Sequence, residues 1–203
     1  MAKTAVVTFG RANPFTVGHR KLVQAVNKEA RKHKGDAFVF LSHSQDPAKN
    51  PLTYQQKIKW AKKSTRYPES IIKSDAKNFF EVMTQVYNKG YDELIVVVGA
   101  DRIAEFENLA RKYNGVEARH GFYDFNNISV VSAGDRDPDA EGVEGMSASK
   151  VRAAVAAGDF ESFKMGVSDV LSDRELAQYY QDVRRGMGIR ESFILRFKSF
   201  IGS

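Results

Sequence analysis

The chain has 203 residues and no cysteine. This length suits one α/β domain with a sizeable core and a small helical appendage, and the lack of cysteine excludes disulfides, thiolate metal sites and cysteine nucleophiles. No apolar run approaches the roughly 18 residues of a membrane span, and the N-terminus lacks a signal-peptide pattern, so we expect a soluble, cytoplasmic protein. The net charge of +6 favours anionic partners. Basic residues are spread over many segments without a long tail or an RNA-reading motif, which disfavours nucleic acid.

Apolar runs alternate with amphipathic patterns along most of the chain. Four runs bounded by Gly, Asp or Ser predict buried parallel strands, and four segments with apolar residues at helical spacing predict helices. This alternation predicts an α/β fold, a Rossmann-like doubly wound parallel sheet with helices on both faces. The expected strands are 4–9, 37–41, 94–98 and 128–131, and the expected helices are 19–33, 54–66, 78–89 and 101–113. The segment 115–125 fits either an irregular strand or a loop.

Only helical patterns follow residue 146. They predict helices over 147–157, 160–165, 173–185 and 191–200. Capping boxes are expected where Thr53 precedes Gln56 and where Ser172 precedes Glu175, and Asp159 is a further candidate cap. We therefore expect an α/β domain over residues 1–158 and a helical extension over residues 159–203 that packs on the same domain.

The decapeptide after the first apolar run reads Gly-Arg-Ala-Asn-Pro-Phe-Thr-Val-Gly-His. It stands where a parallel strand gives way to a helix, the edge at which open α/β sheets bind ligands. Gly10 permits a tight turn and a close backbone approach, Pro14 stiffens the loop, and Gly18 leaves space at the helix entrance. The helix N-terminus attracts phosphate, to which Thr16 and His19 can donate hydrogen bonds. Nearby positive charge comes from Arg11, Arg20 and Lys21.

A second polar segment opens the helix expected at 147–157 and reads Gly-Met-Ser-Ala-Ser-Lys-Val-Arg. Ser147 and Ser149 supply hydroxyl donors and capping capacity, while Lys150 and Arg152 supply positive charge. Together with the N–H groups of the helix start, these side chains favour a polyphosphate. We expect this segment and the first loop to flank one cavity.

The first loop lacks both the Walker pattern and Gly-x-Gly-x-x-Gly. It resembles the signature Gly-x-x-x-Pro-x-[His/Thr]-x-Gly-His of the HIGH-type nucleotidyltransferase superfamily, which includes cytidylyltransferase-like proteins and adenylyltransferases. Thr16 takes the place of the first signature histidine, as in the phosphopantetheine adenylyltransferase branch. The second segment resembles the superfamily's Ile-Ser-[Ser/Thr]-x-x-[Arg/Lys] element, with Met146 in place of isoleucine. Over nearly its full length the chain is also similar to small nucleotidyltransferases of tailed bacteriophages, which implies the host cytoplasm.

The resemblance implies roles for individual residues. Thr16 would orient the acceptor phosphate and His19 would stabilise the α-phosphoryl group in the transition state. Lys49, in the loop before the helix at 54–66, would contact the acceptor phosphate or the transferring phosphoryl group, and Arg152 would hold the phosphates. The implied nucleotide-binding residues are Gly10, Arg11, Pro14, Gly18, Gly99, Asp101, Arg102, Arg136, Met146, Ser147, Ser149 and Lys150.

Some of these residues leave alternatives open. Asp101 is expected to cap the following helix, with Phe106 in the core, whereas Arg102 faces either the nucleotide or solvent. Arg136, in the acidic loop 133–145, would clamp the leaving pyrophosphate. His43, at the end of the second strand, either lines the acceptor pocket or has a structural role.

The resemblance implies that an acceptor phosphate attacks the α-phosphorus of a nucleoside triphosphate and that pyrophosphate leaves. Such chemistry depends on positioning and charge stabilisation rather than on a covalent nucleophile. We expect AMP transfer from ATP to a small phosphorylated acceptor such as nicotinamide mononucleotide or phosphopantetheine. Mg²⁺ would be held through the nucleotide phosphates, with no metal site of the protein's own.

Two alternatives stay open. One is transfer from CTP to a phospho-alcohol, and the other is a non-catalytic nucleic-acid or virion-associated protein on the same scaffold. A homo-oligomer is compatible with each of these functions.

Overall fold

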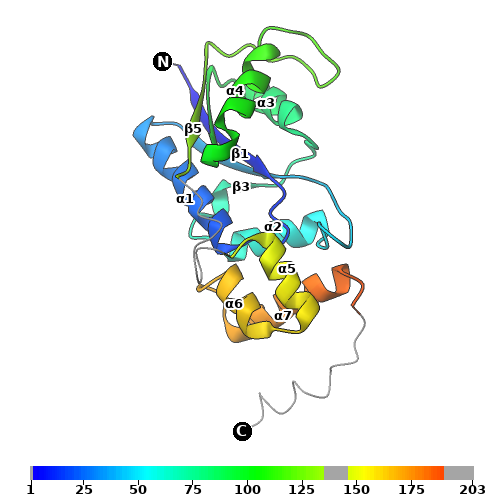
Figure 1. Cartoon of the computed structure of the whole chain (residues 1–203). Coiled ribbons are helices and arrows are strands. Elements are labelled where there is room, and N and C mark those ends of the chain that lie inside the picture. Colours follow the sequence, from blue (N-terminus) through cyan, green and yellow to red (C-terminus); the bar gives the residue numbers. More distant parts are fainter. Residues whose placement is uncertain (1, 135–145, 190–203) are drawn as a thin grey trace.

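The computed structural model describes residues 2–134 and 146–189, and a five-stranded sheet forms its centre (Figure 1). The strands are β1 (Thr4–Gly10), β2 (Asp36–Leu41), β3 (Ile71–Ile72), β4 (Glu93–Val98) and β5 (Asn127–Ser132). They pair in the order β3-β2-β1-β4-β5, and every pair is parallel. This arrangement confirms the predicted Rossmann-like α/β fold.

The first strand lies in the middle of the sheet. β1 pairs with β2 from Ala5–Asp36 to Gly10–Leu41 and with β4 from Thr4–Glu93 onward. The chain winds away from β1 in one direction through β2 and β3 and in the other through β4 and β5, so the strand order reverses between β1 and β4. At such a switch point the connecting loops diverge and leave a crevice at the carboxyl ends of the strands.

Helices cover both faces of the sheet. The helices on the faces are α1 (Val17–Lys32), α2 (Tyr54–Lys63), α3 (Phe79–Asn88) and α4 (Ile103–Lys112). The later helices are α5 (Ala148–Ala157), α6 (Phe160–Val167) and α7 (Asp173–Gly186). Alternate strand residues point to opposite faces, so that Val7 and Val96 pack toward α3 and α4, whereas Val6 and Val97 pack toward α1 and α2. The helix expected at 191–200 lies outside the described residues.

A third apolar cluster joins the late helices to α2. Trp60 of α2 packs there with Val151 of α5, Phe163 of α6 and Tyr179 of α7, and each of these side chains is fully buried. Ile58, on another side of α2, belongs to the cluster beneath the sheet. One helix therefore connects the sheet core to the C-terminal helices, which lie beyond the carboxyl end of β1 (Figure 1).

The predicted elements agree with the structure except at a few places. The edge strand β3 was not predicted because two residues are too short for a pattern, and 115–125 forms only an isolated bridge between Ala118 and Gly121. The capping boxes at Thr53 and Ser172 and the cap at Asp159 are confirmed. The expected cap at Asp101 is wrong, because the 3₁₀ turn Ala100–Arg102 precedes α4 and no side chain caps that helix.

Candidate functional site

The first loop ends in a reciprocal contact between Thr16 and His19. Thr16 is the N-cap of α1, and its backbone N–H donates to Nδ1 of His19 at 3.1 Å. The Thr16 hydroxyl lies 2.8 Å from the same nitrogen. An N–H group can only donate, so Nδ1 is an acceptor and a neutral His19 carries its proton on Nε2. The contact thus orients the ring and places the proton of the neutral imidazole on Nε2.

Asn13 ties this loop to the segment that enters α2. Its side-chain amide donates to the carbonyl of Leu52 at 3.1 Å, and its side-chain oxygen accepts from the N–H of Leu52 at 3.0 Å. Both residues are buried. Asn13 was not predicted as a site residue, because no local pattern shows that a side chain pairs with backbone 39 residues away.

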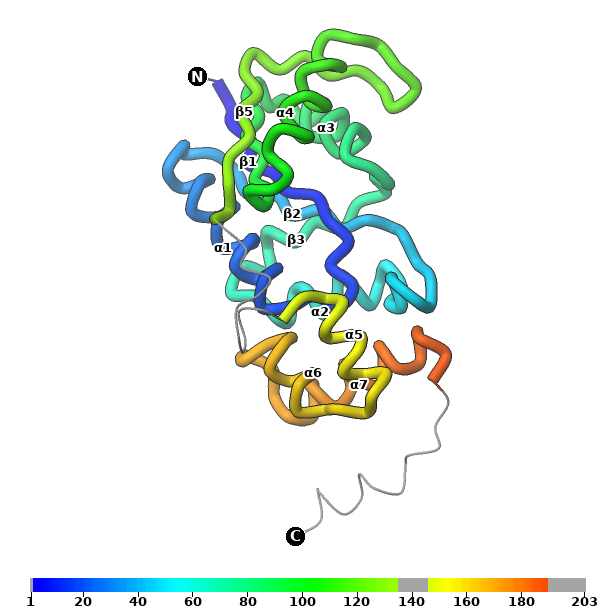
Figure 2. Tube along the Cα trace, viewed as in Figure 1, coloured from blue at the N-terminus to red at the C-terminus, as the bar shows by residue number. Residues whose placement is uncertain are grey.

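Arg152 brings the late helix to the first loop. One guanidinium nitrogen donates to the carbonyl of Asn13 at 2.8 Å and the other to the hydroxyl of Ser149 at 3.2 Å. Figure 2 shows the chain leaving β1 and passing close to α5 before it enters α1. The two polar segments found in the sequence therefore meet in space.

The charge around Arg152 is mainly positive. Burial, followed by the neighbouring guanidinium of Arg11, lowers the pKa of Arg152, while the carboxylate of Asp46 raises it. Among the described residues no carboxylate forms an ion pair with Arg152. Two guanidinium groups held near each other without such a partner favour a polyanionic ligand.

Lys49 lies at the exposed tip of the loop between β2 and α2. The carboxylate of Asp46 shapes this tip by accepting from the N–H of Lys49 at 2.6 Å and from the side-chain amide of Asn50 at 2.5 Å. Because the carboxylate of Asp46 also acts on Arg152, the tip that carries Lys49 stands at the same edge of the sheet.

The glycines of the first loop are not required by contacts within the protein. Among the atoms of residues 2–134 and 146–189, a Cβ atom on Gly10 would meet none within 4 Å, and one on Gly18 would meet only the Thr16 hydroxyl at 3.7 Å. The tight turn expected at Gly10 lies instead at Ala12, whose φ is 41°. Pro14 is buried, and its bond to Asn13 is cis. Within the described part of the chain, the space in front of Gly10 is open and Gly18 has only this one ordinary contact, which is compatible with the close approach of a ligand.

The start of α5 has the expected cap. The Ser147 hydroxyl accepts from the N–H of Lys150 at 3.1 Å, and both Ser149 and Lys150 are exposed. Met146 instead packs against the third apolar cluster. It would lie 2.9 Å from a Cβ atom on Gly166 of α6, so the structure gives it a packing contact.

Of the remaining predicted residues, Arg20 lies on α1, and the others lie after β4 or outside the described residues. Gly99 precedes the 3₁₀ turn, and Asp101 is exposed. The guanidinium of Arg102 forms a two-pronged contact with Glu105 at 2.8 and 3.0 Å, whereas Phe106 is buried as expected. Arg136 lies outside the described residues. Arg20 forms an ion pair with Asp169, before α7.

Lys57 and His43 complete the carboxyl edge of β2. Lys57 is fully buried and donates to the carbonyls of Ser42 and Ser44, and burial lowers its pKa to about 8. His43 stacks on Tyr54 at 3.8 Å. The lysine was not predicted, because in the sequence it belongs to an ordinary basic helix face.

The described residues contain neither a group of metal-ligating side chains nor a membrane-spanning helix. No group of three or more His, Asp or Glu residues in 2–134 and 146–189 could hold a metal ion. No helix in these ranges is long and apolar enough to cross a membrane.

Comparison with protein families places the chain in a known group. The model of the cytidylyltransferase-like family matches residues 7–154, more than half of the chain, and this range contains the first loop, Lys49 and Arg152. None of the curated proteins compared with the chain matches it, so the similarity to bacteriophage nucleotidyltransferases stays an expectation. The chain belongs to the cytidylyltransferase-like family and is a nucleotidyltransferase.

Proposed function

We propose that the protein transfers AMP from ATP to a small phosphorylated acceptor and releases pyrophosphate. The contact of Arg152 with the carbonyl of Asn13 carries this proposal, because it joins the Ser147 helix start to the Thr16–His19 turn. Nicotinamide mononucleotide and phosphopantetheine are the acceptors that we favour. Transfer of CMP from CTP to a phospho-alcohol is the competing reaction on the same scaffold.

In the proposed reaction the side chains position phosphates and stabilise charge. Nε2–H of His19 donates to the α-phosphoryl group as the acceptor oxygen attacks, and Thr16 orients the acceptor phosphate. Arg11, Lys49 and Arg152 neutralise the phosphates and the departing pyrophosphate. The prior contact between Thr16 and His19 supports this assignment, because a ring that is already oriented costs little to align with the reacting group.

The donors at this edge fit phosphate oxygens rather than a metal ion. Hydroxyl, guanidinium and ammonium groups predominate there. The carboxylate of Asp46 already accepts hydrogen bonds from Lys49 and Asn50 in its own loop. The Mg²⁺ that accompanies a nucleoside triphosphate would therefore be held by phosphate oxygens and water. When bound, it would neutralise part of the phosphate charge.

A pocket lined by His43 and by residues of α2, β3 and α3, but by none of residues 10–19, supports a small acceptor. Its volume is about 570 Å³, and His43 is one of its lining residues. The preceding residue, Ser42, donates its N–H to the carbonyl of Gly10 at the start of the first loop. The stacked rings of His43 and Tyr54 form one wall. We propose that the organic part of the acceptor binds here while its phosphate reaches Thr16.

A pyrophosphate-release screen tests the proposal. ATP and CTP are each paired with nicotinamide mononucleotide, phosphopantetheine and simple phospho-alcohols, and we expect ATP with one of the first two acceptors to react. Release only from CTP with a phospho-alcohol would establish the competing reaction. No release from any pair, together with steeply salt-dependent DNA or RNA binding, would establish the non-catalytic alternative.

The substitution His19→Ala tests the assigned role. It removes one donor to the transition state, so we expect kcat/KM to fall by roughly two to three decades. His33→Ala is the matched control, because His33 lies at the opposite end of the same helix, and it should keep the wild-type rate. An equal rate in His19→Ala and wild type would contradict the role of His19.

A further inference from the structure

A tyrosine from the C-terminal helix α7 binds the first loop directly. The N–H of Phe15 donates to the hydroxyl of Tyr179 at 2.7 Å, and this hydroxyl donates to the carbonyl of Phe15 at 3.1 Å. Tyr179 is fully buried and Phe15 is 1% exposed. Because water cannot reach Phe15 or Tyr179, the tyrosine hydroxyl is the partner of a backbone N–H and a backbone carbonyl that would otherwise lack hydrogen bonds.

The position of Phe15 affects both polar side chains of the turn. Phe15 precedes Thr16 in the chain, and its ring packs on the ring of His19 with 5.6 Å between centroids. A displacement of the Phe15 backbone would therefore shift the N–H of Thr16, which holds Nδ1 of His19. Tyr179 stands behind the turn and contacts neither of these side chains in the described hydrogen bonds.

Tyr179 is itself held rigidly. Its ring stacks on Trp60 of α2 at 4.4 Å with 13° between the planes and meets the edge of Phe163 at 5.5 Å. The indole N–H of Trp60 donates to the carboxylate of Asp182 at 2.9 Å, and Asp182 lies one turn beyond Tyr179 on α7. These contacts fix where the tyrosine hydroxyl stands relative to α2.

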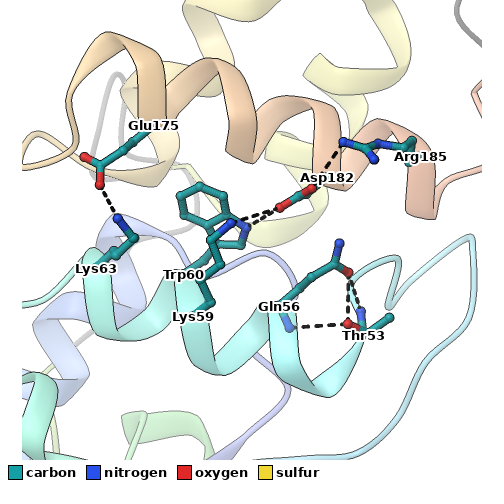
Figure 3. A network of polar contacts seen from close by, with 8 residues as sticks. All are labelled: Thr53, Gln56, Lys59, Trp60, Lys63, Glu175, Asp182 and Arg185. Carbon is teal, nitrogen blue, oxygen red and sulfur yellow. Dashed lines mark hydrogen bonds and ion pairs between the residues drawn. The ribbon is translucent and has the colours of Figure 1, made fainter.

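Ion pairs fasten the same two helices along their length (Figure 3). Asp182 lies 3.8 Å from Lys59 of α2 and 3.6 Å from Arg185 of α7. Near the other end of α7, Glu175 pairs with Lys63 of α2. Asp182 itself is 7% exposed, whereas the side chains of Lys59 and Arg185 are 38% and 67% exposed. The buried hydrogen bond between Trp60 and Asp182 therefore contributes most to making α7 a firm support for Tyr179.

We propose that Tyr179 is a positioning residue for nucleotidyl transfer, acting through the backbone of Phe15 on the Thr16–His19 turn. This inference rests on the proposed function of that turn. The family match ends at residue 154, whereas Tyr179 lies on α7. The proposal therefore gives a role in the reaction to a helix outside the matched region. The hydroxyl keeps the turn in the geometry that the transition state needs, and a small displacement of such a turn is costly in rate.

Tyr179→Phe tests the proposal, and Tyr180→Phe is its matched control. Tyr180 is the next residue on α7, is 1% exposed and belongs to the same cluster, but none of the described hydrogen bonds joins its hydroxyl to the first loop. We expect kcat of Tyr179→Phe to fall about tenfold or more with KM values close to wild type. Tyr180→Phe should keep the wild-type kcat.

Hydrogen exchange at the Phe15 amide provides a readout that needs no activity. Exchange should be slow in the wild type and in Tyr180→Phe, and faster in Tyr179→Phe. Should Tyr179→Phe fail to fold, Trp60→Phe keeps the hydroxyl and weakens only its support, and a lower kcat with faster Phe15 exchange is then expected.

The outcomes separate the two proposals. An active wild type whose kcat is unchanged by Tyr179→Phe overturns the inference and leaves the transfer function intact. An equal loss in Tyr180→Phe also overturns it, because the effect would then be general packing. If the wild type releases no pyrophosphate, the transfer function fails, and with it the catalytic role of Tyr179. Unequal exchange in the two variants would then still establish that its hydroxyl holds the loop.

Discussion

Arg152 shows how much of this site depends on the shape of one side chain. Its planar guanidinium reaches the carbonyl of Asn13 and the hydroxyl of Ser149 at once. A lysine carries the same charge, but its single nitrogen does not reproduce this fork. At this position geometry therefore matters more than charge.

The substitution Arg152→Lys should separate the effect of the guanidinium geometry from the effect of the positive charge. We expect kcat/KM to fall roughly a hundredfold although the charge is kept, because the first loop loses its fixed contact with α5. Arg111→Lys is a suitable control, since Arg111 also donates to a backbone carbonyl, that of Ile128, but from α4. Steady-state pyrophosphate release measures both variants, and a wild-type rate in Arg152→Lys would refute the need for the fork.

The sequence predicted candidate site residues where the chemistry is local. Thr16, His19 and Ser147 were found because a helix start shows itself in neighbouring residues. Asn13 and Tyr179 were missed because each binds backbone groups that are distant in the chain. Such contacts leave no periodic or spaced pattern, since any residue supplies a backbone N–H and carbonyl.

At the scale of elements, the helix α2 combines three tasks. It packs on the sheet through Ile58, supports Tyr179 through Trp60 and buries Lys57 beneath the loop that follows β2. The ammonium of Lys57 holds the carbonyls of Ser42 and Ser44. The loop that leads to Lys49 is thus anchored at its start by a buried cation.

The burial of Lys57 predicts a pH dependence of stability. Its pKa is about 8 in the folded protein, below the value of about 10.4 expected for an unfolded chain. Between these values the unfolded chain binds a proton that the folded protein has lost, so the free energy of unfolding rises with pH. Relative to Lys57→Met, the wild type should gain about 1–2 kcal/mol between pH 7.5 and 9.5.

Urea unfolding at several pH values measures this difference. Lys62→Met is the control, because Lys62 is exposed on the same helix, and it should follow the pH dependence of the wild type. Parallel curves for the wild type and Lys57→Met would show that burial does not shift the lysine as described.

Most elements were predictable because capping residues and changes from apolar to polar residues mark their ends in the sequence. Polar caps begin α2, α6 and α7 at the expected residues, and strands such as Glu93–Val98 are continuous apolar runs. The failures have physical causes as well. The strand β3 has only two residues. The helix α4 is preceded by a 3₁₀ turn and has no capping side chain at its start.

At the scale of the whole molecule, the sequence predicted the fold class and the meeting of the two polar segments. It could not show what the C-terminal helices cover. An amphipathic pattern indicates that α7 buries one face, but many surfaces would satisfy that requirement. The structure shows that this face is shared with Trp60 and Val151, so the late helices and the sheet domain have a common core.

A chain ending at residue 158 tests this common core. The truncation would expose Trp60, which is fully buried in the full chain, together with its apolar neighbours in α5. We expect loss of cooperative urea unfolding and of near-UV circular dichroism, with binding of a hydrophobic dye. A truncated chain that unfolds cooperatively at the same urea concentration as the full chain would establish residues 1–158 as an independent folding unit.

The hydrogen bonds between Phe15 and Tyr179 join residues 164 positions apart. Chains emerge from the ribosome from the N-terminus, and the elements that emerge first can fold before the rest is made. The strand β1 and the turn after it are among the first parts to appear, yet the support for that turn is synthesised with α7. The first loop therefore gains this support only after translation has passed α7, and we expect ribosome-bound intermediates that stop earlier to release pyrophosphate more slowly than the full chain.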